Sequence, residues 1–294
     1  MAVKDRIPKA KLLELLDDFS VMGVKAVTYS GGGEPLIYPD IDEIMARTLE
    51  LGIHLSCITN GSRLTGRTAE LLGNAKWVRV SMDYSSPKQL SQFRGTQGNE
   101  YWSIMDNLRE FAQSKQLNCD LYVNFIVHKD NHSELFEVAN KLKCIGVQNV
   151  RFSPMWVAPG FHDYRAQIEG SVMAQLSEIK GKLVSETFSV NSTYDTDSPV
   201  HSTVRPYHRC LFAQVVPVVG ADQRVYACHN KAYDSSGVIG SIADKSFKEL
   251  WESEEARRAL EEIDPSIHCK HQCAAEHKNR LITEYMATSF DAFV

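Results

Sequence analysis

The chain has 294 residues, enough for one large domain or for a core domain with a smaller one. Its hydrophobic content of 43% and charged content of 23% are typical of globular proteins and argue against a disordered or fibrous chain. With 32 Lys and Arg against 37 Asp and Glu, the net charge of −5 offers no basic footprint for nucleic acid. No apolar run approaches the ~18 residues of a membrane span, and the N-terminus lacks the apolar core of an export signal. We therefore expect a soluble, cytoplasmic protein that binds neither membranes nor nucleic acid.

The first half of the chain alternates between helix-like and strand-like segments. Apolar residues at helical spacing predict helices, and short β-branched runs bounded by glycine or Asn-Gly predict strands. The expected helices are 8–22, 40–51, 65–72, 101–114 and 133–142, and the expected strands are 24–29, 53–59, 77–83, 120–128 and 149–156. Such alternation implies parallel strands joined by right-handed crossovers, as in an α/β barrel or an open sheet. Because these five units open on a helix, they predict an incomplete (β/α) barrel that lacks its first strand.

The pattern changes after residue 156. We expect a helix over 171–185, a linker over the Ser/Thr/Asp-rich residues 191–203, a hairpin from 215–219 and 224–227, and helices over 247–263 and 274–288. These elements predict a barrel-like region at 1–160, a connecting helix and linker at 161–205, and a small α+β domain at 206–294.

A glycine-rich run, Ser30-Gly31-Gly32-Gly33-Glu34-Pro35, directly follows the first predicted strand. Consecutive glycines allow positive φ angles and let a ligand approach the backbone without a Cβ in the way. Ligands of parallel α/β folds bind at the carboxyl ends of strands, where this run lies. The spacing matches neither a dinucleotide fingerprint nor a P-loop, and a plain structural turn is the alternative interpretation.

A strand that ends in GGGEP resembles the GGE motif of radical S-adenosylmethionine (SAM) enzymes. Thr59-Asn60-Gly61 is similar to the TNG strand end of the same family, and the resemblance covers most of residues 8–156. It implies that the glycine loop contacts the methionine amino group of SAM and that polar residues on later strands line the rest of the pocket. The residues implied for the SAM pocket are Gly31, Gly32, Gly33, Glu34, Ser81, Asp83 and Asn124.

The sequence departs from this family in one respect. The family's defining C-x-x-x-C-x-x-C loop, whose three thiolates hold a [4Fe–4S] cluster with one open iron, has no counterpart, and the first cysteine is Cys57. Three interpretations stay open. The chain begins after the loop, it kept the scaffold without the radical chemistry, or another polypeptide completes its site.

The seven cysteines fall into two groups, and without an export signal they do not indicate a disulfide framework. Those beside apolar runs predict buried side chains: Cys57, Cys119 and Cys144. Those in polar, His-rich surroundings predict one metal site: Cys210, Cys228, Cys269 and Cys273. Four thiolates hold either an iron–sulfur cluster or zinc, and their spacing alone does not decide between them.

The resemblance extends to this second group. Many radical SAM proteins carry a C-terminal SPASM or Twitch domain, with a cysteine-flanked hairpin followed by a cysteine pair and a helix. It implies one auxiliary [4Fe–4S] cluster held by the four cysteines, with Cys269 the least secure ligand because its pair is spaced C-x-x-x-C. Neighbouring histidines such as His208 and His277 are interpreted as surface groups or as groups that support the ligands without binding the metal, since four cysteines already complete a site.

These observations predict an iron–sulfur protein of radical SAM type. In intact form it would cleave SAM reductively and abstract hydrogen from an unknown substrate, such as a peptide, a sugar or a small metabolite. A further chain or segment would supply the first cluster, so enzymatic activity depends on that loop. The alternative is a non-catalytic metal-binding protein with a structural zinc or iron–sulfur site and a vestigial SAM pocket.

Overall fold

The computed structural model describes residues 6–95, 98–157, 160–194, 204–270 and 273–288. The chain forms two compact units, one made of residues 24–196 and the other of residues 1–23 together with 197–294. None of the helices in the described ranges is long and apolar enough to cross a membrane.

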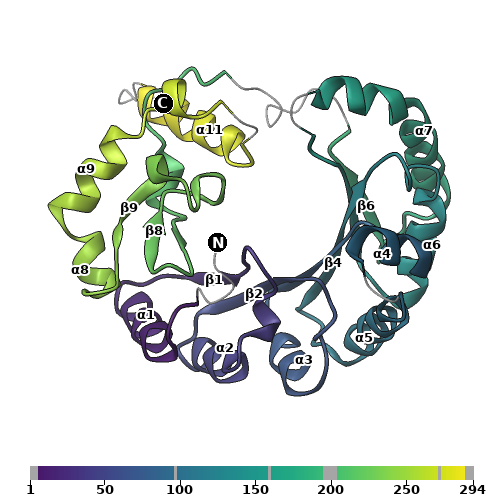
Figure 1. The fold of residues 1–294 in the computed structure, drawn as a ribbon, viewed down its shortest axis with the longest axis horizontal. Coiled ribbons are helices and arrows are strands. Elements are labelled where there is room, and N and C mark those ends of the chain that lie inside the picture. The colour runs from purple at the N-terminus through teal and green to yellow at the C-terminus, as the bar shows by residue number, and fades with distance from the viewer. Residues whose placement is uncertain (1–5, 96–97, 158–159, 195–203, 271–272, 289–294) are drawn as a thin grey trace, which may run out of the picture. The chain divides into compact units, whose positions relative to one another are not determined.

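The unit of residues 24–196 is built on a parallel sheet whose six strands follow one another in chain order (Figure 1). The strands are β1 (Ala26–Tyr29), β2 (His54–Thr59), β3 (Trp77–Met82), β4 (Asp120–Val127), β5 (Asn149–Pro154) and β6 (Ser189–Ser192). The helices that cover its outer face are α2 (Ile41–Glu50), α3 (Gly66–Leu72), α5 (Glu100–Ser114), α6 (Leu135–Ile145) and α7 (Phe161–Lys182). This arrangement is a partial (β/α) barrel.

Side chains alternate strictly along the central strands. On β3, Val78 and Val80 are fully buried against the helices, whereas Arg79 and Ser81 point to the other face and are half-buried. The same alternation runs along β4, so one face forms the apolar core. The opposite face, here called the inner face, carries polar side chains that are free to meet a ligand.

The predicted α/β class and its parallel sheet are confirmed, with differences in particular elements. The sequence analysis missed β6, whose Ser and Asn residues resemble a linker, and it missed α4 (Pro87–Arg94). Helix α7 begins at Phe161, ten residues before the predicted start, so the predicted connecting region contributes α7 and β6 to the sheet unit. Residues 195–203 of the predicted linker lie outside the described residues. The absence of a first barrel strand stays a prediction.

The second unit contains a three-stranded antiparallel sheet in the order β7–β8–β9. Its strands are β7 (Val218–Val219), β8 (Arg224–Tyr226) and β9 (Val238–Ser241), and its helices are α1 (Lys9–Val21), α8 (Phe247–Trp251), α9 (Glu254–Glu262), α10 (Pro265–His268) and α11 (Glu276–Ala287). The predicted hairpin is confirmed, with Gln223 at φ 60° in its turn. The predicted helix 247–263 is two helices, because Ser253 caps the start of α9.

Helix α1 belongs to this second unit although it precedes the sheet in the chain. Leu15 is buried in one apolar cluster with Ile239 and Leu250. The Asp18 carboxylate accepts a hydrogen bond from the Lys248 backbone N–H at 2.9 Å. Such long-range packing explains why the sequence analysis placed this helix with the barrel.

Candidate functional site

The glycine run lies at the carboxyl end of β1, as predicted, and all three glycines are exposed. Neither Gly31 nor Gly33 adopts the positive φ that glycine allows. A Cβ built on Gly33 would meet no atom within 4 Å. Neither backbone conformation nor packing within the chain therefore requires glycine at position 33, and the loop leaves its backbone open to a ligand.

Glu34 ties this loop to the end of the neighbouring strand. Its Oε1 accepts hydrogen bonds from the Thr59 hydroxyl at 2.6 Å and from the Leu36 N–H at 3.1 Å. Its Oε2 accepts from the Asn60 N–H at 2.6 Å. Both carboxylate oxygens are therefore engaged within the chain, and they fix the loop relative to the end of β2.

The Thr-Asn-Gly end of β2 is closely packed against its neighbours. Gly61 has φ +81°, and a Cβ there would lie 3.1 Å from Val80 Cγ1 and 3.2 Å from Ile104 Cγ2. Asn107 on α5 donates to the Gly61 carbonyl at 2.9 Å. This glycine, unlike Gly33, is required by the fold itself.

Ser81 and Asn124 lie side by side on the inner face. They are direct partners in the parallel register of β3 and β4, and both are half-buried. The Ser153 hydroxyl of β5 donates to Asn124 Oδ1 at 3.1 Å. The structure therefore brings these two predicted pocket residues together and adds a third polar side chain beside them.

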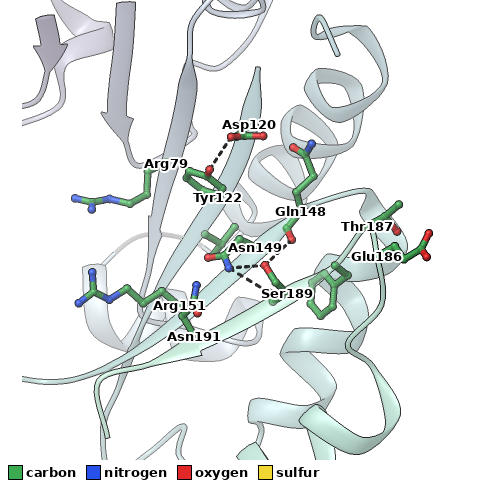
Figure 2. A pocket seen from close by; sticks show the side chains of 12 residues that line it. Arg79, Asp120, Tyr122, Gln148, Asn149, Arg151, Glu186, Thr187, Ser189 and Asn191 are labelled. Carbon is green, nitrogen blue, oxygen red and sulfur yellow. Dashed lines mark hydrogen bonds between the residues drawn. The ribbon is translucent and has the colours of Figure 1, made fainter. Parts of the chain in front are cut away.

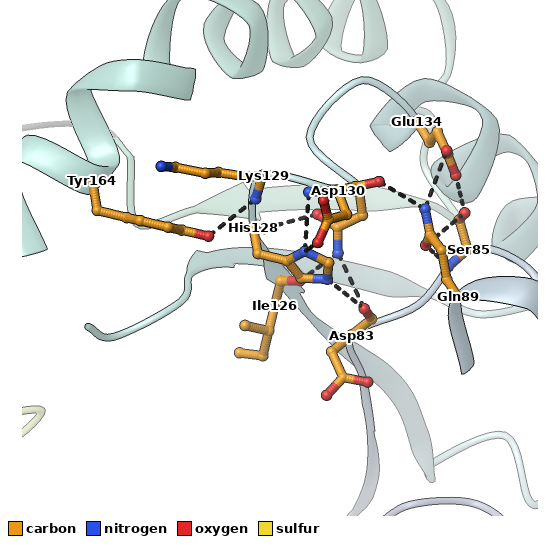
Figure 3. Close-up of polar contacts among 10 residues, drawn as sticks. Asp83, Ser85, Gln89, Ile126, His128, Lys129, Asp130, Glu134 and Tyr164 are labelled. Carbon is orange, nitrogen blue, oxygen red and sulfur yellow. Dashed lines mark hydrogen bonds and ion pairs between the residues drawn. The ribbon is translucent and has the colours of Figure 1, made fainter. Parts of the chain in front are cut away.

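Asp83 follows the end of β3 and is held by residues that the sequence analysis did not single out. Its Oδ2 accepts from Arg94 Nη2 at 2.8 Å. Its backbone carbonyl accepts from His128 Nε2 at 2.9 Å and from Asn131 Nδ2 at 3.2 Å (Figure 3). The sequence contains two signals for α4: Ser86 is an N-capping residue, and Gly95 directly follows the last residue of the helix. These signals could have placed Arg94 on a helix near this strand end.

His128 is a buried support for this strand end. Its ring is 1% exposed, and Nδ1 accepts a hydrogen bond from the Asp130 N–H at 3.2 Å, so the hydrogen resides on Nε2 and points at the Asp83 carbonyl. Next to it, Gln89 joins the Ser85 N–H to the Asp130 carbonyl, as Figure 3 shows. The loop after β3 is therefore held by a connected network of hydrogen bonds.

The cysteines of the sheet unit are distributed along the chain: Cys57 lies on β2, Cys119 directly precedes β4, and Cys144 lies on α6. Cys57 and Cys119 are fully buried, as predicted, whereas the prediction of a buried side chain is wrong for Cys144, which is exposed on α6. Burial, with a smaller contribution from the charge of Glu34, raises the pKa of the Cys57 thiol to about 12. Such a neutral, enclosed thiol is suited to packing and is unsuited to reaction.

The second candidate site gathers the four remaining cysteines. Cys210 precedes a short turn at Leu211–Gln214, and Cys228 follows β8. Cys269 directly follows α10, and Cys273 lies three residues before the start of α11. Burial raises the pKa of the Cys269 thiol to about 11 and also raises the pKa values of Cys228 and Cys273. Each of these three pKa values is raised further by the charge of Cys210, which places the four thiols in one electrostatic neighbourhood.

Polar side chains surround these thiols. Asn279, 1% exposed on α11, donates from Nδ2 to Cys210 Sγ at 3.4 Å and accepts from the Phe212 N–H at 2.9 Å. The buried amino group of Lys231 donates to Ser236 Oγ at 2.7 Å, and its positive charge lowers the pKa of Cys269 against the larger effect of burial. A donor and a cation at these positions both favour a bound group of negative charge.

The donor set fits an iron–sulfur cluster by its chemistry. Four thiols in one neighbourhood are the usual ligands of a [4Fe–4S] cluster. Within the described ranges, no group of three or more His, Cys, Asp or Glu side chains is arranged to hold a single metal ion. His208 is exposed and paired with Asp264 at 2.9 Å, as expected of a surface histidine.

Comparison with known protein families matches two regions of the chain. Residues 4–142 match the Radical SAM superfamily, and residues 210–274 match SPASM, an iron–sulfur cluster-binding domain. The chain therefore carries a region of Radical SAM type and a C-terminal SPASM region, and these families imply [4Fe–4S] clusters and SAM binding.

Individual relatives are distant. The chain is 23% identical over 269 residues to the AdoMet-dependent heme synthase of Methanosarcina barkeri, covering 83% of this chain and 73% of that protein. It is 25% identical over 136 residues to the S-adenosylmethionine-dependent nucleotide dehydratase of Lacinutrix mariniflava, covering 44% of this chain but 28% of that protein. In structure it is similar to Streptococcus suis SuiB bound to precursor peptide SuiA, with a TM-score of 0.64, 14% identity, and coverage of 94% of this chain and 66% of that chain.

Proposed function

We propose that residues 24–196 bind SAM across the carboxyl ends of β1 to β4, and that the second unit holds one auxiliary [4Fe–4S] cluster. Together they would serve a radical SAM enzyme that abstracts hydrogen from its substrate. The observation that carries the proposal is the hydrogen bonding of Glu34 to Thr59 and Asn60, which joins an open glycine loop to the adjacent strand end. Such a preformed polar edge, at the carboxyl ends of parallel strands, is where ligands of this fold bind.

The residues at this edge have separate roles in the proposal. Gly31, Gly32 and Gly33 present backbone groups to the methionine portion of SAM, and Glu34 positions that loop. Ser81 and Asn124 offer a hydroxyl and an amide from the inner face, as neighbours in register. Asp83, oriented by Arg94, offers a carboxylate beside them. Each can bind or orient SAM by hydrogen bonding.

The auxiliary cluster would be held by Cys210, Cys228, Cys269 and Cys273. A [4Fe–4S] cluster supplies either an electron-transfer centre or a substrate-binding iron. Among the described residues, the three cysteines of the sheet unit do not come together as a metal-holding group, so they provide no donor set for a first cluster. In the proposal this first cluster is therefore held by thiolates that the sequence does not contain, and no step of SAM cleavage is assigned to the described residues.

The substrate is proposed to be a peptide, a sugar or a small metabolite. The structural similarity to SuiB, a protein whose structure contains a precursor peptide, makes peptides the first class to test. The alternative function is a non-catalytic metal-binding protein with structural zinc or an iron–sulfur cluster and a vestigial SAM pocket.

Three measurements on the full chain, after anaerobic reconstitution, test the proposal. We expect about four irons and four sulfides per chain, saturable SAM binding in titration calorimetry, and 5′-deoxyadenosine only when the missing thiolates are supplied. Zinc in place of iron, together with no SAM binding, would establish the alternative. Deoxyadenosine from the chain alone would show that other ligands hold the first cluster.

A matched pair of variants assigns the SAM pocket. Ser81→Ala removes a hydroxyl from the inner face, whereas Ser114→Ala removes an exposed hydroxyl on α5. We expect weaker SAM binding for the first variant and unchanged binding for the second. Equal affinities in both would remove Ser81 from the pocket.

A further inference from the structure

Two arginines project from the inner face of the sheet unit. Arg79 lies on β3 opposite Tyr122 of β4, and Arg151 lies on β5 opposite Asn124 of β4. Figure 2 shows both side chains extending to the same side of the sheet. The two guanidinium groups therefore lie on the same side of the sheet, and a single strand separates the strands that carry them.

Neither guanidinium is neutralised within the described part of the chain. No carboxylate there forms an ion pair with Arg79 or Arg151, and Arg79 Nε is buried without a hydrogen-bond partner. Two carboxylates line the same pocket. Asp120 accepts a hydrogen bond from the Tyr122 hydroxyl at 2.7 Å, and Glu186 lies on the side of the pocket away from the arginines in Figure 2. Burial, and then the like charge of Arg151, lower the pKa of Arg79.

A cavity accompanies this pair. It has a volume of about 700 Å³ and is lined by both arginines together with polar groups such as Tyr122, Asn149 and Asn191. Small-molecule sites commonly have volumes of about 300–1,000 Å³. A cavity of that size lined by two cations has the charge and the room for an anionic ligand.

We propose that Arg79 and Arg151 form an oxyanion-binding subsite that holds a carboxylate or phosphate group of the substrate. A guanidinium donates two parallel hydrogen bonds to the oxygens of such a group. The bound anion would satisfy the buried Arg79 Nε and remove the repulsion between the two cations. The ligand class is therefore a molecule with at least one oxyanion.

The subsite also orients that molecule, a step that rests on the proposed SAM pocket. Arg151 lies in the same register row as Ser81 and Asn124, and Arg79 precedes Ser81 by two residues. Two residues of a parallel strand rise about 7 Å. An oxyanion held by the arginines thus leaves the remainder of the substrate directed along the inner face towards the carboxyl ends of the strands.

The test uses inorganic phosphate and glutarate as probes, titrated into the full chain in chloride buffer of constant ionic strength. We expect at least one probe to bind saturably, and the probe that binds identifies the oxyanion as phosphate or carboxylate. Arg151→Gln, at an exposed position, and Arg79→Gln should each weaken that binding about tenfold or more. Arg109→Gln, which alters an exposed arginine paired with Asp106, should leave it unchanged.

Two further measurements distinguish the oxyanion subsite from the proposed SAM pocket and from a purely structural role of the arginines. SAM affinity should stay within about twofold of the wild type in both variants. A wild-type protein that binds a probe but does not bind SAM would contradict the proposed SAM pocket and leave the oxyanion subsite standing. The unfolding temperature of the ligand-free Arg151→Gln variant should equal or exceed that of the wild type, because a repulsive charge is removed. Failure of both probes to bind the wild type, or wild-type probe affinity in both variants, would overturn the subsite.

Discussion

The Glu34 carboxylate and the Thr59 hydroxyl are joined by a hydrogen bond of 2.6 Å, so the loop after β1 and the end of β2 behave as one structural element. The same carboxylate also accepts hydrogen bonds from the backbone N–H groups of Leu36 and Asn60. A single charged side chain thereby fixes the position of the open glycine loop on which the proposed SAM pocket depends.

We predict that Glu34→Gln lowers the free energy of unfolding by about 2 kcal/mol and weakens SAM binding. The amide keeps one acceptor oxygen but places an NH₂ group against N–H donors, leaving at least one of them unpaired. Urea unfolding and SAM titration measure the two effects.

Glu70→Gln serves as the control, since Glu70 is exposed and its carboxylate pairs with Arg67 of the same helix at 3.0 Å. It should change the free energy of unfolding by less than about 0.5 kcal/mol. A Glu34→Gln protein as stable as this control would show that the loop is held by other contacts.

The sheet unit is predicted to lose stability in alkaline solution through Cys57 and Tyr29, which are register partners on β2 and β1. Burial raises the pKa of Cys57 from 9.0 to about 12 and that of Tyr29 from 10.0 to about 12. Both groups are neutral at pH 7 in the folded and unfolded chain. Above pH 9 the unfolded chain ionises first, so stability falls from there towards pH 12.

Cys57→Ala should make stability fall less steeply with pH between pH 9 and pH 10. The packing that the substitution removes lowers stability equally at every pH and does not change this slope. Unfolding temperatures measured from pH 7 to pH 11 test the point, with Cys144→Ser, an exposed site, as the control. Parallel pH profiles for the wild type and Cys57→Ala would exclude Cys57 as a source of the effect.

Local periodicity was sufficient to predict most of the sheet unit, because its strands alternate with amphipathic helices. The sequence analysis missed β6 because Ser189, Asn191 and Ser192 are polar: only Val190 of this edge strand faces the core. It also placed α1 with the barrel, since the burial of Leu15 against Ile239 depends on a contact between distant parts of the chain.

The candidate sites also differ in whether the local sequence was sufficient to predict them. The glycine loop and the four cysteines are recognisable because their residue types and order carry the signal. The placement of Arg79 and Arg151 on the same side of the sheet depends on which strands pair and in which register, so it became visible only in the structure. The same holds for the hydrogen bonds that Asp83 receives from Arg94 and His128.

Loss of a single ligand should distinguish the cysteines of the second unit from those of the sheet. Cys228→Ala is predicted to lower the iron and sulfide content sharply, because three thiolates hold a cluster less firmly than four. Cys57→Ala, at a buried position on β2, should leave that content unchanged, as should Cys144→Ser. Iron and sulfide assays after anaerobic reconstitution provide the measurement, and equal iron loss in Cys228→Ala and Cys57→Ala would contradict the ligand assignment.

Asn279 should support the auxiliary site without being a ligand. Its amide donates to Cys210 Sγ at 3.4 Å and accepts from the Phe212 N–H at 2.9 Å, so Asn279→Ala leaves a backbone donor unpaired beside the thiol. We expect a loss of about 1–3 kcal/mol in the free energy of unfolding and faster loss of iron to a chelator. His277→Ala, at an exposed position on the same helix, should alter neither quantity. Chelator kinetics on both reconstituted variants decide the matter: if Asn279→Ala releases iron at the rate of His277→Ala, the amide has no part in holding the cluster.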